Sequence, residues 1–359
     1  MKGNPTIELL RIIGSPFVTS KTLTEPRESI ELYNYAFKNR VALLYLTVLK
    51  NSGQLKQLRS QYEQLEYRYK ETLITVARVA KILNMANIKY AIYKTIRPYP
   101  ATPNDLDIIF LGPDGAYRQA LKVLKNEGYI ELCQAPLQVL FSDPRGIGIA
   151  KWDKSGGIYY VDVYKEAAAD YFVYLNKDEL KKSVIFVEIA GYDGVKILTP
   201  EADLASILVH SVFPEMTYAL EVFYTILYYL KQWNKDNLDR FFNFVKSNRI
   251  VLPVRANLTV TAILHKEAFG NIPKKLLHVL NGLGGIYLPE IQRIKEKKFK
   301  TPHKFSLSTF FKTILYKLGD SSALKSLGVQ VIHMLNPVFA LDVFKTLNKI
   351  RKRETYLQV

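Results

Sequence analysis

Two aspartates separated by one residue, Asp105 and Asp107, combine a residue type and a spacing that could do metal chemistry. The apolar residues 106–111 around and after them favour a β-strand. Residues two apart on a strand point to the same face, so the two carboxylates would lie side by side. Carboxylate oxygens are ligands that Mg²⁺ prefers in proteins. The sequence therefore predicts a metal-binding pair at these two positions.

A third acid, Asp162, stands alone within an apolar run at residues 158–164 that also favours a strand. Burying a lone carboxylate is costly unless the group is paired or metal-bound. A metal shared with Asp105 and Asp107 would supply that partner. Divalent ions held by three such acids could activate an attacking hydroxyl and stabilise a pyrophosphate leaving group.

The segment before the aspartate pair offers cations and a hydroxyl. Residues 90–93 favour a short strand, and three prolines between residues 98 and 103 require a loop. Lys94, Thr95 and Arg97 lie between the two and are candidate substrate contacts. A plain loop role is the alternative for all three, because basic residues beside prolines are usually solvated.

Together these motifs resemble the nucleotidyltransferase superfamily, the DNA polymerase β-like group, over about residues 70–200. The family pattern is a strand ending in Gly-Gly or Gly-Ser, a loop, Asp-x-Asp on the next strand and a third acid on a later strand. Here the first strand ends in Lys94-Thr95, nine residues intervene, Asp-Leu-Asp follows at 105–107, and Asp162 is the third acid.

The resemblance implies metal-dependent transfer of a nucleoside monophosphate from an NTP to a hydroxyl of RNA, a protein or a small molecule. Asp105 and Asp107 would hold Mg²⁺, with Mn²⁺ as the alternative ion. Asp162 would bind one metal ion and act as base toward the acceptor hydroxyl. The likeness extends to uncharacterised prokaryotic members whose helical region opens with Pro-Glu-Asp/His, and residues 199–203 here read Thr-Pro-Glu-Ala-Asp.

The chain departs from the family pattern at Lys94-Thr95, where a Cβ narrows the approach of backbone amides to a triphosphate. Thr95 could offer a hydroxyl in place of serine, and Lys94 or Arg97 could meet phosphate charge. The departure keeps open a catalytically silent fold that binds nucleic acid or protein. A third possibility is the toxin of a toxin–antitoxin pair, because relatives of the fold serve in such systems.

The expected fold class is α+β, in three parts. Residues 1–86 have helical spacing, with a break near residues 51–53, and would pack on the catalytic domain. Residues 87–198 would form a nucleotidyltransferase-like mixed sheet of five or six strands. Residues 199–359 would form an all-helical domain with a basic tail, opening at a capping threonine followed by proline. His210 would be a helix-face residue with a local hydrogen bond.

Composition limits the class of protein. With 48% hydrophobic and 23% charged residues, the chain is expected to bury a globular core. The single cysteine, Cys133, excludes an internal disulfide framework and a Cys-rich zinc site, and it is expected to be buried. Residues 222–230, the most apolar run, are far short of the roughly 20 needed to span a bilayer. We therefore expect a cytoplasmic protein with no membrane partner.

The formal net charge of +17 favours polyanionic partners such as NTPs and RNA. The excess is concentrated at the C-terminal end, where lysine and arginine outnumber aspartate and glutamate by 14 to 5 from residue 290 onward. Residues 293–304 could contact a phosphate backbone, although a solvated face is the more common role of such a run. Nothing in the sequence indicates an oligomeric state.

Overall fold

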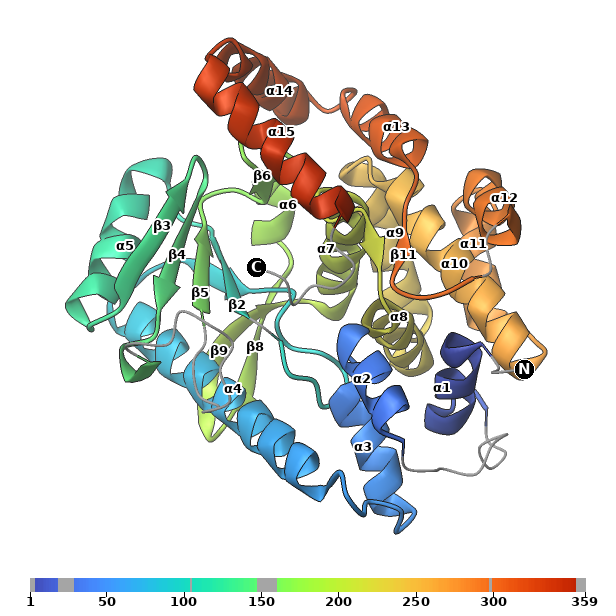
Figure 1. Cartoon of the computed structure of the whole chain (residues 1–359). Coiled ribbons are helices and arrows are strands. Elements are labelled where there is room, and N and C mark those ends of the chain that lie inside the picture. Colours follow the sequence, from blue (N-terminus) through green and yellow to red (C-terminus); the bar gives the residue numbers. More distant parts are fainter. Residues whose placement is uncertain (1–3, 19–28, 104, 147–159, 297–298, 353–359) are drawn as a thin grey trace.

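The computed structural model describes residues 4–18, 29–103, 105–146, 160–296 and 299–352, and Figure 1 shows their arrangement. Helices come first along the chain, a seven-stranded mixed sheet follows, and further helices complete the chain. The α+β class expected from the sequence is confirmed.

Four helices precede the sheet: α1 (Pro5–Ile13), α2 (Ile30–Lys38), α3 (Ala42–Asn51) and α4 (Arg59–Met85). The expected break near residues 51–53 is present, because α3 ends at Asn51 and Gly53 has a left-handed φ of 71°. Buried side chains in the later part of α4, from Val76 to Leu83, pack against the sheet. Tyr62 and Leu65 near its start, together with the buried side chains of α1, α2 and α3, belong to the larger core formed with the C-terminal helices.

The sheet has the strand order β3-β4-β5-β2-β1-β9-β8. Its strands are β1 (Tyr90–Ile92), β2 (Asp105–Phe110), β3 (Ile130–Ala135), β4 (Gln138–Ser142), β5 (Tyr160–Tyr164), β8 (Val184–Ile189) and β9 (Tyr192–Leu198). β2 pairs in parallel with β5 and antiparallel with β1. Residues 158 and 159, expected to begin β5, lie outside the described residues.

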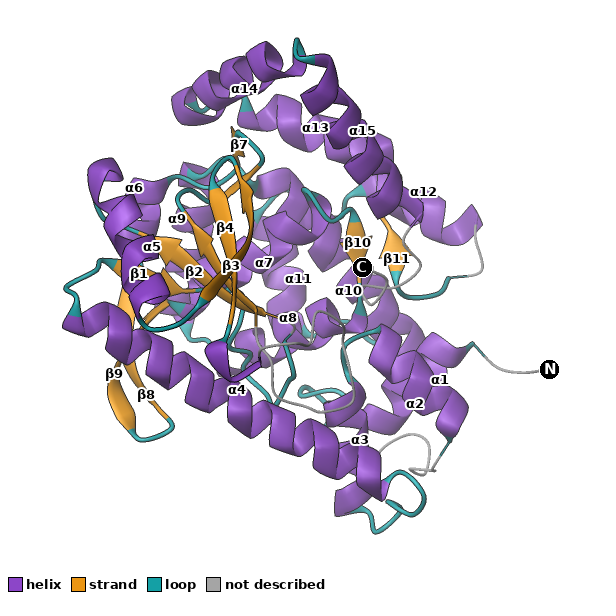
Figure 2. Cartoon of the chain, turned by 60° about the vertical axis from the view of Figure 1, so that its left-hand side comes forward, coloured by secondary structure: helices purple, strands orange, loops and turns teal. Residues whose placement is uncertain are grey.

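Alternation along β2 separates a core face from a polar face. Leu106, Ile108 and Phe110 join the core that α4 and α5 (Tyr117–Asn126) form over one side of the sheet. Figure 2 shows these two helices beside the sheet. Asp107 and Ile109 point to the other side, because side chains alternate along a strand. Ile109 there joins the larger core with the C-terminal helices. The polar face of β2 is thus turned toward those helices.

Nine helices follow β9 among the described residues: α7 (Pro200–Val212), α8 (Leu220–Gln232), α9 (Lys235–Ser247), α10 (Val251–Phe269), α11 (Lys274–Gly282), α12 (Leu288–Glu296), α13 (Leu307–Lys317), α14 (Ser321–Met334) and α15 (Pro337–Lys352). The expected helix start is confirmed, since the Thr199 side chain caps α7 and Pro200 occupies its first turn. Residues 222–230 lie in α8, where nearly all of them are buried.

Short elements connect these layers. They are the helix α6 (Lys177–Lys181), the hairpin of β6 (Ala168–Ala169) and β7 (Phe172–Val173), and the pair of β10 (Thr217–Tyr218) and β11 (His303–Lys304). Of the basic run at 293–304, residues 297 and 298 are not described.

The expectation that Cys133 is buried is wrong. The residue is exposed, because β3 is an edge strand whose residues 130–134 are all exposed. A strand at a sheet edge has a neighbouring strand on one side only. Its side chains are therefore covered less than those of the same sequence inside the sheet.

No single helix in the described part of the chain is both long and apolar enough to cross a membrane. The helix α14 and the first part of α15 reach that length and apolarity only together, as a pair bent by 106° at the break between them.

Candidate metal centre

A cavity of about 370 Å³ lies between the polar face of the sheet and the helices α7 and α8. The strands β2, β4 and β5 contribute Asp105, Asp107, Gln138, Asp162 and Tyr164 to its lining. The C-terminal helices and the loop after α7 contribute further lining residues, which are Ile207, His210, Ser211, Pro214, Glu215, Glu221 and Val222. Lys94, Arg97 and Arg40 also line it. The cavity is therefore polar and carries charges of both signs.

The three aspartates predicted from the sequence meet at the floor of this cavity. Each offers one carboxylate oxygen, and these three oxygens lie within 4.8 Å of one another. The parallel pairing of β2 with β5 causes this, since Asp107 is directly opposite Asp162 in the register. Asp105 is two residues before Asp107 and therefore points to the same face.

Burial makes the charged form of this cluster unfavourable. It raises the pKa of Asp107 to about 7; the Asp105 carboxylate adds to the rise, while Lys94 opposes it. Burial, reinforced by Asp105 and Asp107, raises the pKa of Asp162 well above its ordinary value. Carboxylates that resist ionisation in this way need added positive charge nearby.

The residues present fit a divalent metal ion. Asp162 is 6% exposed, and its Oδ1 atom is buried without a hydrogen-bond partner among the residues described. A buried carboxylate oxygen left in this state is costly unless it binds a cation. Three oxygen donors at this spacing form a ligand set suited to a hard ion. Asp105, Asp107 and Asp162 would hold it.

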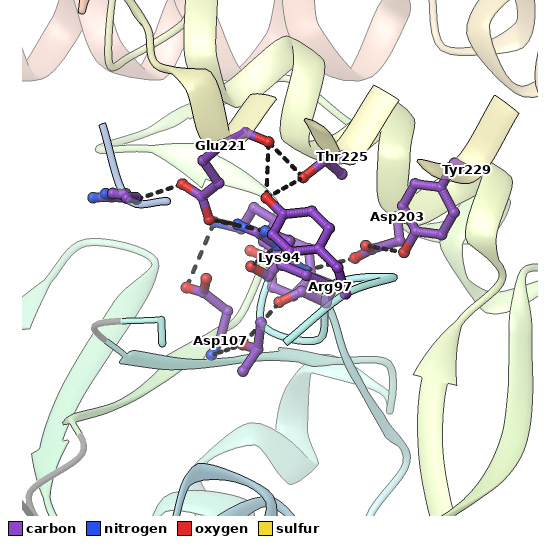
Figure 3. Close-up of polar contacts among 11 residues, drawn as sticks. Lys94, Arg97, Asp107, Asp203, Glu221, Thr225 and Tyr229 are labelled. Carbon is purple, nitrogen blue, oxygen red and sulfur yellow. Dashed lines mark hydrogen bonds and ion pairs between the residues drawn. The ribbon is translucent and has the colours of Figure 1, made fainter. Parts of the chain in front are cut away.

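Lys94 follows β1 and lies beside Asp107 of the cluster, as Figure 3 shows. Its Nζ atom is 3.5 Å from Asp107 Oδ1 and lies over the rings of Tyr93 and Tyr164. The side chain is 5% exposed. Burial works against the ammonium charge, but Asp107 and its acidic neighbours outweigh burial, so the pKa of Lys94 is raised. Lys94 therefore keeps its positive charge near pH 7, and this charge acts on the three carboxylates.

Asp203, in the first turn of α7, holds the backbone of Lys94 in place. Its Oδ1 atom accepts a hydrogen bond from the Lys94 amide at 2.6 Å, and its Oδ2 atom accepts one from the Tyr229 hydroxyl at 3.0 Å (Figure 3). In the same turn, Glu201 accepts hydrogen bonds from Asn237 and Arg240 of α9. The motif at 199–203 thus attaches the helical region to the edge of the site.

Thr95 acts on the neighbouring strand. Its hydroxyl accepts a hydrogen bond from the Asp107 amide at 2.9 Å and contacts the Tyr93 carbonyl at 3.2 Å. The side chain is buried, and the described residues that line the cavity do not include it. Thr95 therefore fixes the position of the Asp107 backbone relative to the end of β1.

Arg97 is bound within the protein. Its Nε and Nη2 atoms lie 2.9 and 2.8 Å from Glu221 Oε1, and Nη1 donates to the Lys94 carbonyl. Arg40 Nη1 lies 3.3 Å from Glu221 Oε2. Burial alone would raise the pKa of Glu221, but Arg97 and Arg40 outweigh burial and lower it. This ion-paired group forms the cavity wall next to Lys94.

His210 also reaches the cavity, from α7. Its Nδ1 atom lies 3.2 Å from the hydroxyl of Tyr174, which is 36 residues away in the chain and is therefore not the local partner expected from the sequence. Burial lowers the pKa of His210 well below its ordinary value, and nearby cations lower it further. The imidazole is therefore neutral near pH 7.

Sequence reasoning missed Arg40, Glu221 and Tyr164 as site residues. Arg40 and Glu221 lie far from the aspartates in the chain and belong to no local motif, so no sequence signal marked them. Asp203 had a signal, because it closes the motif at 199–203, but its contact with Lys94 depends on the packing of α7. No family model matches this chain, and no curated protein matches it.

Proposed function

We propose that the protein is a metal-dependent nucleotidyltransferase that moves a nucleoside monophosphate from an NTP to a hydroxyl acceptor. The observation that carries the proposal is the convergence of Asp105, Asp107 and Asp162 on one face of two parallel strands, beside a cavity. A resemblance of the α+β fold to the nucleotidyltransferase arrangement is part of the proposal. Its support is the order of β1, the loop, β2 and the later strand β5 with the third acid.

Each aspartate has a role in this proposal. Asp105 and Asp107 would hold Mg²⁺, or Mn²⁺, and the ion would supply positive charge to neutralise the triphosphate and to polarise the reacting phosphate. Asp162 shares the ion and accepts the proton of the acceptor hydroxyl. The acceptor oxygen forms a bond to the α-phosphorus, and the bond from that phosphorus to the bridging oxygen of pyrophosphate breaks.

The cavity between the C-terminal helices and the sheet is the proposed site for substrates. Residues of α7 and α8 line the cavity opposite the aspartates, so residues 199–359 would cover a catalytic sheet domain at 87–198 and contact the acceptor. The net charge of +17 favours a polyanionic acceptor such as RNA, with a protein or small molecule as the other classes. An NTP substrate fits the cytoplasmic location expected from the sequence.

The experiment is a transfer assay with each of the four α-³²P-labelled NTPs, in Mg²⁺ or Mn²⁺, with total cellular RNA and protein as acceptors. We expect one NTP to label one acceptor class, and we expect Asp105→Asn to remove the label. The control is Asp193→Asn, the same change at an exposed aspartate at the turn end of β9. Labelling that is unchanged in Asp105→Asn would refute the assignment.

The second candidate is a catalytically silent fold that binds nucleic acid or protein. The observation that favours it is that the cations expected to meet the triphosphate are engaged within the protein, Lys94 with Asp107 and Arg97 with Glu221. Calorimetry with Mg²⁺ and each NTP separates the two. Binding of an NTP with micromolar affinity supports the enzyme, whereas absence of NTP binding together with retained RNA binding supports the scaffold.

A further inference from the structure

The backbone of Lys94 has a conformation that glycine adopts more easily than lysine. Its φ is 56°, in the left-handed region that a Cβ disfavours. The Lys94 amide donates a hydrogen bond to Asp203, and the Lys94 carbonyl accepts one from Arg97. These two bonds hold the residue in this conformation. A strained position of this kind at a functional site points to a use for the side chain, because glycine would remove the strain.

The Lys94 side chain is directed at the carboxylate cluster. The ammonium is 3.5 Å from Asp107 Oδ1, is buried, and is flanked by the faces of Tyr93 and Tyr164. Aromatic faces stabilise a cation without supplying a formal charge. The ammonium is therefore held in place by carboxylate and rings together, and it neutralises part of the cluster's negative charge.

The formal charges in the site leave room for a single divalent ion. Three ionised carboxylates carry −3 and Lys94 carries +1, which leaves −2. The nearby Arg97 and Arg40 carry +2, which the −2 of Glu221 and Asp203 balances, and burial keeps His210 neutral near pH 7. A second divalent ion would bring excess positive charge into a buried site and would face the ammonium.

We propose that Lys94 is a built-in cation that takes the place of a second metal ion, so that the carboxylate cluster holds one divalent ion. This inference rests on the metal site of the proposed function and specifies its stoichiometry. Lys94 acts through the carboxylates, as an electrostatic and positioning residue. Its ammonium also lowers the affinity of the cluster for the ion that it does hold, because like charges repel.

The test is a titration of the full chain with Mn²⁺, followed by electron paramagnetic resonance. We expect one Mn²⁺ per wild-type chain, with no spin coupling between ions. Lys94→Met, which keeps the length of the side chain, should bind the first Mn²⁺ at least about tenfold more tightly. Even at the dielectric constant of water, removing a like charge this close to a ligand oxygen has an effect of that size. At saturating Mn²⁺ the variant should show a second, coupled ion.

Two further variants make the result specific. Lys94→Arg keeps the charge and should retain one ion. Lys50→Met is the matched control, because Lys50 also lies over a tyrosine ring, that of Tyr62, and 3.7 Å from a carboxylate of Glu66, away from the cavity. It should leave Mn²⁺ binding unchanged.

Several outcomes overturn the inference. Two coupled Mn²⁺ ions in the wild-type chain would do so. So would weaker Mn²⁺ binding by a folded Lys94→Met, because Lys94 would then only support Asp107. If Lys94→Met does not fold, the ion counts of the wild type and Lys94→Arg decide: one ion in each supports the inference, and two overturn it. Absence of Mn²⁺ binding by the wild type refutes the proposed metal-dependent function itself, a distinct result.

Discussion

The two halves of the candidate site differ in what their residues contact. In the metal half, Asp105, Asp107 and Asp162 point into the cavity, and one buried oxygen lacks a partner among the described residues. In the phosphate half, which comprises Lys94, Thr95 and Arg97, the side chains are engaged by other residues of the protein.

This difference indicates which substitutions should affect nucleotidyl transfer and which should affect the stability of the fold. A buried group without a protein partner contributes little to folding and is available to a ligand. A buried group with excellent ion-pair or hydrogen-bond geometry destabilises the fold when its partner is removed. Changes in the metal half should therefore reduce transfer, whereas changes in the phosphate half should first reduce the free energy of unfolding.

The largest expected effect is that of Asp162→Asn on transfer. Loss of an outer-shell partner of a metal ligand typically costs roughly 10–100-fold, so loss of a ligand should cost more than about 100-fold. In EDTA, the melting temperature should be equal to or higher than that of the wild type, because the variant removes a buried carboxylate with an unpartnered oxygen. Labelling assays and thermal melts measure the two. A transfer rate within tenfold of wild type would exclude Asp162 from the site.

Arg97→Met should have the largest effect on stability. It leaves Glu221 buried with Arg40 as its remaining ion-pair partner, and breaking a buried pair costs roughly 3–5 kcal/mol. Urea denaturation measures the free energy of unfolding. The double variant Arg97→Met/Glu221→Gln should recover part of the loss. If Arg97→Met keeps its stability but loses NTP affinity, Arg97 is a substrate ligand and the contrast between the halves fails there.

Between about pH 4 and 7, the metal half should make stability depend on pH. Burial raises the pKa of Asp107 to about 7 from 3.8, so the folded state binds more protons than the unfolded state between these values. The contribution of Asp107 to stability in EDTA should therefore be greatest below about pH 4 and fall as pH rises toward 7, by at most about 1.4 kcal/mol per unit. Asp107→Asn should flatten this part of the profile, which denaturation at several pH values measures. Mg²⁺ should restore stability at pH 7; if it does not, the cluster does not bind the ion.

Thr95→Val should have the smallest effect. It removes the hydroxyl that accepts from the Asp107 amide at 2.9 Å, and a buried hydrogen bond of this kind contributes about 1 kcal/mol. Thr95→Ser keeps the hydroxyl and serves as the control in the same denaturation experiment. An unchanged stability combined with weaker NTP binding would show that Thr95 contacts the triphosphate.

Regular structure explains which parts of the site could be predicted. The alternation of side chains on β2 follows from local sequence, and it places Asp105 and Asp107 on one face. The start of α7 is equally local, because the capping threonine and the proline lie within one turn. The exposure of Cys133 could not be predicted in this way, because it depends on β3 having a neighbour on one side only.

By itself the sequence determined the α+β class, the aspartate pair on one strand and the start of the helical region, because each depends on residues close together in the chain. Only the tertiary structure decided that Asp162 stands opposite Asp107, that Asp203 holds Lys94, and that Glu221 engages Arg97. These contacts join residues far apart in the sequence, and their energies depend on burial and on distances that only the packed chain defines.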